Sequence, residues 1–531
     1  MTKTQITLPL HKIPEADQPL SVFELGDRHM APEPTLHAAC RLNAPDVELK
    51  SFGHAGAKAA HDGKRLVGFV NPVTGESTAF PLLEALKPGR GLRESARRAA
   101  TGLAEDVSLF PKDASRIVPL EPIILAGRRH ERDGGRRSPT HEYLAYVRFQ
   151  REVQGHPVFG PGTQAMASLT ADGALHGFSH RWRLAQPIAL RLPSRPREDI
   201  AESIRAQLAS ASETATVTVD TVKIGYYDAG ARFLQPVYYF TATLASRNRE
   251  LRAANRRVVG YVPLAEELEP LPVIGRQNGP LPREPQHSGT HHRDRRGSAA
   301  PNDPTVGRYV VRNDAQGWVD SANGFFANLQ LANFFGSAIP FSNAQYYWAE
   351  PFEFLSDKDS FVNSVNIALN EVHGNWGLFS TRDNHDDLVF LNEVPAGGYG
   401  AALAYWILHS CEVIPTATDE TTSFDVWWNI FQGMRAAVGY RTEMWINDGV
   451  TSPFGLSMGL GAPVVSAWFN AIASNSNYGA GDATYLDGNR NIFEPMGRAS
   501  AIAVCGHGDD TAADIGSLGP ASCLTEWWFN N

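Results

Sequence analysis

The sequence predicts two structural regions: an α+β amino-terminal region, with helices on an antiparallel sheet, and an α/β domain at the carboxy terminus. Strands in the first half alternate polar and apolar residues and are joined by turns. A segment rich in Pro, Gly, His and Arg then separates the halves at 263–305. After it, short and wholly apolar runs alternate with helical stretches, which is typical of strands covered by helices on both faces.

The amino-terminal region, residues 1–262, divides into two possible units, 60–190 and 191–262. Apolar spacing and turn residues indicate its elements. In chain order they are a helical stretch over 82–104 that Pro88 and Gly89 interrupt, alternating strands around 143–149 and 165–169, a hairpin turn at Asp172-Gly173, a helix over 197–212, and strands over 216–227 and 233–244.

One stretch of this region carries a family resemblance. The order of its residues resembles the propeptide modules of secreted thermolysin-type peptidases and the related PepSY domains. The matching residues are Val153, Gly155, Pro157, Val158, Phe159 and Gly160, followed by Asp172, Gly173 and Leu175. The resemblance implies that the region is a chaperone or inhibitor of an attached peptidase. The alternative is a generic α+β domain without an inhibitory role.

The segment at 263–305 is expected to be an exposed linker, because it has almost no apolar residues after Ile274 to offset the entropy of ordering. Its cluster of His287, His291 and His292 could bind a metal only incidentally. Exposed basic loops are preferred sites of proteolysis. If the amino-terminal region is a prodomain, a cut after Arg293, Arg295 or Arg296 would release it.

The last domain, residues 306–531, contains ten of the eleven tryptophans and should form one aromatic-rich core. A strand is expected at 307–313 and a helix at 324–336. An amphipathic helix is predicted from Ser423, its cap, to Gly439, its end, and a strand at 442–446. The predicted core stripe of that helix is Trp427, Ile430, Phe431 and Met434.

Two apolar runs in this domain stop on a reactive side chain. One ends at His373 and the other at Cys411. In parallel sheets, active sites lie at the carboxyl ends of the strands, so we expect the two side chains to lie close together at one sheet edge. A thiol beside an imidazole is an activated nucleophile. Gly374 and Cys411 could offer their backbone N–H groups as an oxyanion hole.

A strand ending in His-Gly, followed 38 residues later (411 − 373) by a strand ending in a small residue and Cys, resembles the caspase-hemoglobinase fold. This group of cysteine peptidases includes caspases, legumains and gingipains. The resemblance implies a caspase-like α/β/α sandwich and a His373/Cys411 dyad. Ser410 stands where caspases carry Ala, and Glu412 follows the Cys, so aspartate specificity is not carried over. The alternative is that Cys411 is a buried core residue.

Two polar clusters have metal-ligand residue types without the paired spacing of a metal site, so neither a metal nor another cofactor is predicted. They are Asp383, His385, Asp386 and Asp387, and Cys505, His507, Asp509 and Asp510. Asp419, Asp425 and Asp448 could receive a basic substrate side chain, or could be surface carboxylates and helix caps. The candidate substrate pocket consists of Trp376, Glu412, Asp419, His507 and Asp510.

A net charge of −9 argues against a nucleic-acid partner, and no run is long enough to span a membrane. The amino terminus has no signal-peptide core, and four scattered cysteines fit a reducing compartment, so a cytoplasmic protein is expected. A Cys505–Cys523 pair stays open.

These observations predict a cysteine peptidase-like hydrolase that acts on a peptide or small-molecule substrate and is held inactive by its amino-terminal region. One alternative is a non-proteolytic enzyme of small-molecule biosynthesis that reuses the fold with an aromatic and Asp-rich pocket. Another is a catalytically silent binding module. The sequence does not determine the oligomeric state.

Overall fold

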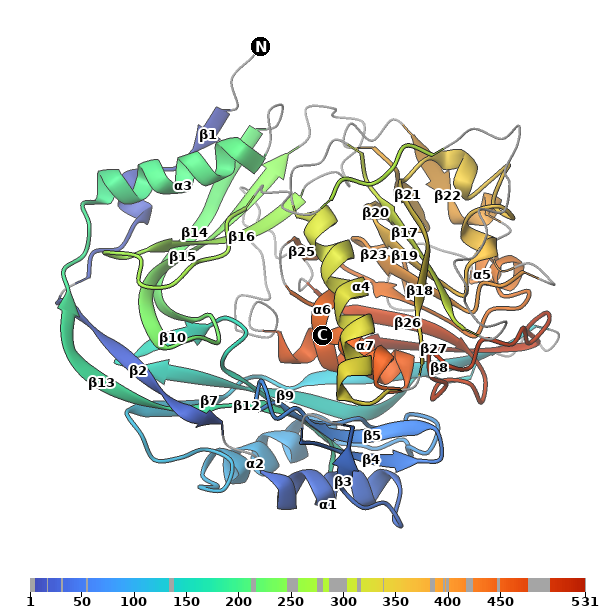
Figure 1. Ribbon diagram of the computed structural model, residues 1–531, viewed down its shortest axis with the longest axis horizontal. Helices are drawn as coiled ribbons and strands as arrows, with labels where there is room; N and C mark the ends of the chain where they lie inside the picture. The colour runs from blue at the N-terminus through green and yellow to red at the C-terminus, as the bar shows by residue number, and fades with distance from the viewer. Residues whose placement is uncertain are drawn as a thin grey trace.

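The structure is a computed structural model. It describes all residues except 1–4, 17, 30–31, 54–55, 133–137, 212–215, 246–255, 275–279, 286–302, 313–316, 338, 383–386, 395–396, 398–400, 417–423, 447–448, 476–496 and 531. The protein is an α/β protein with a large mixed sheet (Figure 1). The described residues form seven α-helices: α1 Glu33–Asn43, α2 Leu92–Ala104, α3 Arg197–Ala211, α4 Trp318–Phe335, α5 Asp425–Ile430, α6 Thr451–Gly459 and α7 Val464–Ser474.

In the described part of the chain, sixteen strands precede residue 264: β1 Gln5–Thr7, β2 Leu20–His29, β3 Lys50–Phe52, β4 Ala57–Asp62, β5 Arg65–Val70, β6 Ser77–Ala79, β7 Ser115–Pro119, β8 Ile123–Glu131, β9 His141–Val153, β10 His156–Phe159, β11 Gln164–Leu169, β12 Leu175–Arg181, β13 Arg183–Leu192, β14 Thr216–Asp228, β15 Phe233–Ala245 and β16 Arg256–Pro263. Eleven follow: β17 Thr305–Val310, β18 Ser342–Trp348, β19 Ile367–Glu371, β20 His373–Asn375, β21 Leu378–Ser380, β22 Leu388–Phe390, β23 Tyr405–His409, β24 Ala436–Tyr440, β25 Trp445–Ile446, β26 Ala499–Val504 and β27 Cys523–Phe529.

A parallel sheet forms the centre of the carboxy-terminal region. Its strand order is β18, β17, β19, β23 and β24, all parallel. β19, β23 and β24 are buried at every position because helices and loops cover both faces, which explains their continuous apolar sequences. β26 and β27 then extend this sheet in antiparallel orientation.

The amino-terminal region continues the same sheet. β8 pairs with β27 over seven residues, from Leu125 opposite Phe529 to Glu131 opposite Cys523. Beyond β8 follow β9, β11, β12, β6, β5, β4 and β3, each antiparallel to its neighbour. Figure 1 shows this sheet passing from the carboxy-terminal strands into the amino-terminal ones without a break.

Another part of the large sheet, joined to β9 through β10, lies on the other side of the amino-terminal region. It contains the long antiparallel strands β14, β15 and β16, to which β1, β10, β2 and β13 are added, and α3 lies beside it (Figure 1). The predicted helix over 197–212, the strands over 216–227 and 233–244 and the hairpin at Asp172-Gly173 are confirmed. Helix α2 confirms only the second half of the stretch over 82–104, after Pro88.

The largest hydrophobic core cluster contains residues of both regions. Helix α7 is buried along its whole length, as expected for a helix that is apolar all round. It contacts β9 and β11 of the amino-terminal region and β24 and β26 of the carboxy-terminal region. Ser466 and Asn470 of α7 donate hydrogen bonds to the carbonyls of Pro81 and Ala79. The boundary near residue 263 therefore divides the sequence but not the core.

Polar contacts seal the same junction. The Asp509 carboxylate accepts the backbone N–H groups of Leu83 and Glu84, at 2.7 and 3.1 Å. The Glu84 carboxylate in turn accepts the N–H of Gly508 at 3.0 Å. Burial raises the pKa of the Asp509 carboxyl to about 6. We name the β8–β27 ladder together with these contacts the seam.

The seam predicts the result of cutting the linker. Cleavage after Arg293, Arg295 or Arg296, which lie outside the described residues, should leave both fragments bound to each other, because breaking the β8–β27 ladder would expose a buried core. Size-exclusion chromatography of the nicked protein should show one species of unchanged volume, separating only in denaturant. Fragments that separate in native buffer would contradict this prediction and support a releasable prodomain.

One predicted element is wrong, and another is shorter than predicted. Of the helix expected from Ser423 to Gly439, only the short helix α5 is present. The second part of the expected helix is instead the strand β24. Trp427, Ile430, Phe431 and Met434 are buried as predicted, but the following Ala-Ala-Val-Gly-Tyr run is apolar on both faces and enters the sheet. The strand expected at 442–446 is reduced to β25.

The linker prediction is wrong for its first part. Leu264, Leu271 and Ile274 belong to the main core, with exposed fractions of 0, 9 and 1%. The buried Glu269 carboxylate accepts the N–H of Phe233 at 2.7 Å, which fixes this segment on β15. The histidines at 287, 291 and 292 lie outside the described residues. No helix among the described residues is both long and apolar enough to cross a membrane.

Candidate active site

The two strands that end near the predicted dyad are direct neighbours. β19 and β23 are parallel, and their last residues, Glu371 and His409, lie in register. Each strand is followed two residues later by a candidate, His373 after β19 and Cys411 after β23. The structure therefore brings both segments to the carboxyl edge of the parallel sheet, where ligands and substrates bind in open α/β sheets.

Gly374 lies directly against the backbone of Cys411. A Cβ atom at position 374 would be 2.1 Å from the carbonyl oxygen of Cys411 and 3.0 Å from the Oγ of Ser410. Only glycine permits this approach. The hairpin that starts at His373 thus packs on the residue that carries the thiol. The absence of a side chain at position 374 therefore makes room for the backbone of Cys411.

Cys411 is not in a disulfide, and its side chain is half-buried. Its Sγ accepts the backbone N–H of Met444 at 3.4 Å. The next residue, Glu412, has a φ of 51°, in the left-handed region that non-glycine residues rarely adopt. The Glu412 N–H donates to the carbonyl of Thr442 at 3.0 Å, and that bond holds the turn. Strained backbone of this kind is frequent at functional sites.

A buried acid, Glu371, and a buried histidine, His409, are the last residues of β19 and β23, two residues before His373 and Cys411. His409 Nδ1 donates to the Glu371 carboxylate at 2.6 Å, and Ser321 Oγ donates to the same carboxylate at 2.6 Å. Trp318, the first residue of α4, packs edge to face against His373 and His409, with ring centroids 5.8 and 5.9 Å away. The indole of Trp318 therefore contacts both imidazoles.

Sequence reasoning missed Glu371, His409 and Trp318. A signal existed for the first two, because each is a polar residue at the end of an apolar run, directly before a candidate segment. Glu371 precedes His373 by two residues, and His409 precedes Cys411 by two. Trp318 gave no such signal, since it reaches the site only through the packing of α4 on the sheet.

The candidates His507 and Asp510 lie at the opposite edge of the sheet. β26 runs antiparallel to β24, with Ala503 opposite Ala436, so the residues after β26 lie near the beginning of β24. There the Asp510 carboxylate accepts hydrogen bonds from Arg435 and from His507 Nδ1. The expectation that they line the Cys411 pocket is wrong, because the direction of β26 places them at the amino ends of the parallel strands.

The other candidate pocket residues lie at different places in the structure. Trp376 is at the turn between β20 and β21, three residues after His373, and 46% of it is exposed. Glu412 adjoins the thiol. Asp425 is exposed in the first turn of α5, where an acid stabilises a helix. Asp383, His385, Asp386, Asp419 and Asp448 lie outside the described residues. Among the described residues, no cluster has the composition of a metal site.

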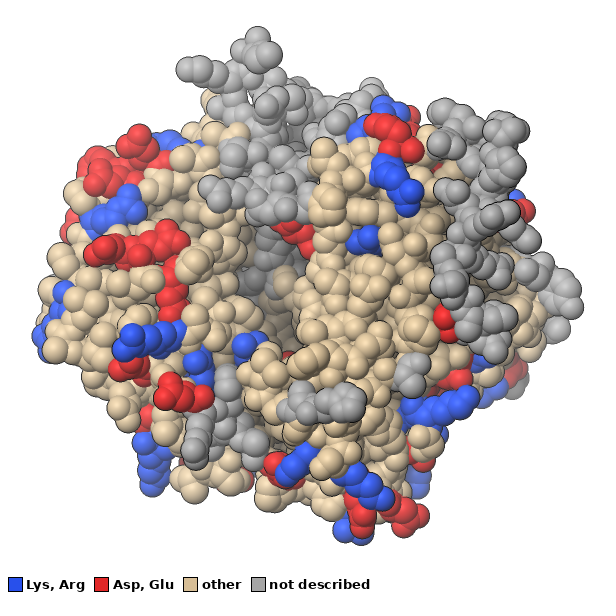
Figure 2. Space-filling view, in the orientation of Figure 1, with Lys and Arg blue, Asp and Glu red and all other residues tan. Residues whose placement is uncertain are grey.

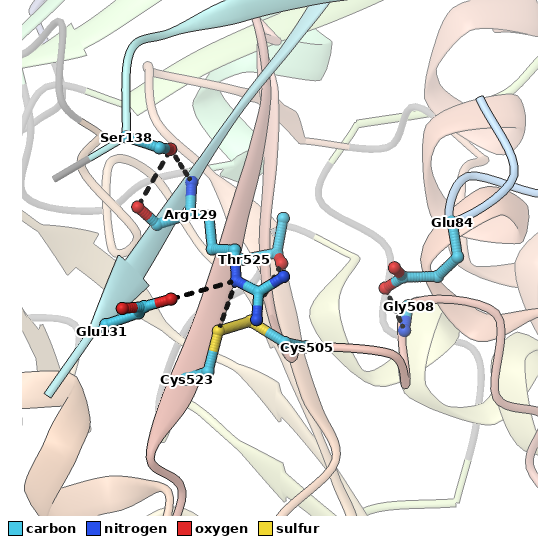
Figure 3. Close-up of a disulfide and its surroundings, with 8 residues drawn as sticks. All are labelled: Glu84, Arg129, Glu131, Ser138, Cys505, Gly508, Cys523 and Thr525. Carbon is cyan, nitrogen blue, oxygen red and sulfur yellow. Dashed lines mark hydrogen bonds and ion pairs between the residues drawn. A yellow bond between two sulfur atoms is a disulfide. The ribbon is translucent and has the colours of Figure 1, made fainter. Parts of the chain in front are cut away.

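Cys505 and Cys523 form a disulfide, with their Cα atoms 5.5 Å apart (Figure 3). Cys505 directly follows β26 and Cys523 begins β27, so the bond joins two neighbouring strands. The Nε of Arg129, on β8, donates to Cys523 Sγ at 2.9 Å. The pairing that the sequence left open is thus made, beside the seam.

Comparisons with known proteins give no activity. A family model described as a domain of unknown function (DUF6345) matches residues 306–491, a range that includes both His373 and Cys411. No curated protein matches the chain. Among solved structures, it is similar to an uncharacterized protein from Eubacterium rectale ATCC 33656, at 10% identity and a TM-score of 0.28, over 47% of this chain and 86% of that one.

Proposed function

We propose that this protein is a cysteine hydrolase of the peptidase type, in which Cys411 is the nucleophile and His373 the base. The observation that carries the proposal is the contact of the His373-Gly374 segment with Cys411 at the carboxyl edge of a parallel sheet. A histidine and a half-buried thiol that is not in a disulfide, each following one of two adjacent strands, suit an activated sulfur nucleophile.

The proposed reaction is acyl transfer. The Cys411 thiolate attacks an amide carbonyl, and the backbone N–H groups of Gly374 and Cys411 receive the oxyanion. The C–N bond then breaks, and the His373 imidazolium gives its proton to the leaving amine. Water, deprotonated by His373, attacks the thioester, releasing the acid and restoring the thiol. The buried Glu371–His409 pair lies at the ends of the two strands that precede His373 and Cys411, and Trp318 packs on His373.

Inhibition of the active site by the amino-terminal region, which the propeptide resemblance implies, stays a proposal. Because the seam unites both regions, inhibition would have to operate without release of the amino-terminal region. The location is also a proposal. Disulfides persist mainly in oxidising compartments, so Cys505–Cys523 favours such a compartment over the cytoplasm that was expected.

Alkylation by iodoacetamide tests the dyad. The native protein should incorporate one label, at Cys411, because the other three cysteines are protected. Cys505 and Cys523 form a disulfide. Cys40 is fully buried, and burial raises the pKa of its thiol to about 12. The alkylation midpoint of Cys411 should lie well below the usual thiol pKa of about 8.5. His373→Ala should slow labelling at pH 6.5 by roughly tenfold.

His507→Ala is the matched control, because it removes a histidine from the opposite edge of the same sheet and should leave the labelling rate unchanged. Peptide mapping identifies the labelled cysteine. If both histidine variants react like wild type, His373 is not the base. If Cys411 is inert in folded wild-type protein, the hydrolase proposal fails and the binding-module alternative gains support.

A further inference from the structure

We propose that the amino-terminal region completes the active site: its strand β16 anchors β25, and β25 holds the backbone N–H of Met444 on the Cys411 thiol. This inference rests on the proposed function and specifies how the site is controlled. It differs from the inhibitory role suggested by the propeptide resemblance, because here the amino-terminal region makes Cys411 more reactive.

The first step is the contact at the sulfur. The Met444 N–H donates to Cys411 Sγ at 3.4 Å. A hydrogen bond to the charged form of an acid favours that form, so this donor favours the thiolate. A backbone N–H has no rotatable side chain of its own. The direction of the Met444 N–H therefore depends on the backbone conformation on either side of Met444.

The second step concerns the backbone on either side of Met444. After β24 the chain turns, and the carbonyl of Thr442 accepts the Glu412 N–H at 3.0 Å. The carbonyl of Glu443 accepts the N–H of Gly497 at 2.6 Å. These bonds fix the segment before Met444 within the carboxy-terminal region. The segment after Met444 is β25, and its parallel partner is β16.

The third step is the rigidity of β16. It pairs with β15 along its whole length, and Val258, Val259 and Tyr261 are buried in the main core. In the β16–β25 bridge Arg257 lies opposite Trp445 and Val258 opposite Ile446. A well-packed strand of the amino-terminal sheet thus holds the two residues that follow Met444.

The surface is consistent with a site built between the regions. Figure 2 shows a hollow in the middle of this face. In the same orientation, Figure 1 has β16 and β25 on one side of that place and α4 on the other. α4 begins with Trp318, which packs on His373.

Proline at position 444 tests the donor directly. Met444→Pro removes the N–H, whereas Met444→Ala removes a similar part of the buried side chain and keeps the N–H. The pH dependence of Cys411 alkylation is the readout. We expect Met444→Pro to raise the midpoint by about one pH unit relative to Met444→Ala, with a roughly tenfold slower reaction at pH 6.5. Equal profiles for the two variants would overturn the inference.

A second pair of variants tests the anchor without touching the donor. Ile446→Pro takes an N–H out of β25, and Ile446→Val keeps it. Ile446→Pro should shift the alkylation midpoint in the same direction, and Ile446→Val should leave it at the wild-type value. An unchanged midpoint in Ile446→Pro overturns the role of β16, and faster labelling supports inhibition instead.

Two internal controls keep these results interpretable. Cys40 is buried in the amino-terminal region, so its continued protection reports that a variant is folded there. His373→Ala in the same assay reports on the dyad. If His373 accelerates wild-type labelling while both proline variants match their controls, the proposed function stands and this inference fails. If His373 has no effect, the proposed function itself fails.

Discussion

Alanine at position 374 is expected to lower the free energy of unfolding by about 1–3 kcal/mol and to remove most of the His373-dependent labelling of Cys411. The added Cβ would lie 2.1 Å from the carbonyl oxygen of Cys411. That oxygen belongs to the backbone, so a side-chain rotation cannot relieve the clash. The hairpin at His373 and the turn at Cys411 must separate, which moves the base away from the nucleophile.

Gly102→Ala is the control for this substitution. Gly102 lies in α2, and a Cβ there would have nothing within 4 Å. Alanine in a helix is better than glycine by about 0.5–1 kcal/mol, so this variant should be slightly more stable than wild type, with unchanged labelling. Denaturant unfolding and alkylation are measured on both. A Gly374→Ala protein that behaves like Gly102→Ala would show that the two segments are not in tight contact.

Truncation of Trp468 should have the largest effect on stability, at about 3–5 kcal/mol. This residue is fully buried on α7, and its Nε1 donates to the carbonyl of Gly439 in β24 at 2.9 Å. Its ring packs edge to face on His409, with centroids 6.2 Å apart. Because α7 contacts strands of both regions, Trp468→Ala should increase hydrogen exchange in β9 and β11 as well as in β24 and β26.

Trp376→Ala supplies the comparison, since that ring is 46% exposed at a hairpin turn and its loss should change the unfolding free energy by less than about 0.5 kcal/mol. Hydrogen exchange measured by mass spectrometry resolves the strands. If Trp468→Ala increases exchange only in β24 and β26, the two regions unfold independently and the shared core does not couple them.

Local sequence patterns were sufficient for several elements. α3, β14 and β15 follow their predicted ranges closely because helical or alternating spacing and the flanking turn residues all agree. The strands before His373 and Cys411 were also found, because a short apolar run that ends in polar residues fits a buried strand. Their proximity followed from a general rule about sheet edges rather than from a contact visible in the sequence.

The failures have a common cause. The run from 436 to 440 has apolar residues that fit a helix end or a strand, and only pairing with β23 and β26 makes it a strand. His507 follows an apolar strand as His373 does. Strand direction alone places the two histidines at opposite edges, and a single strand carries no information about its direction in the sheet.

Sequence patterns alone predicted most of the local elements, the parallel sheet of the last domain and the two residues worth testing as a dyad. The tertiary structure decided what lies around them. Gly374 against Cys411, the Met444 N–H on the thiol, the buried Glu371–His409 pair and the seam between the regions all join residues far apart in the chain. Such contacts depend on strand order and packing, because periodicity within a window records which face of an element is buried but not its partner.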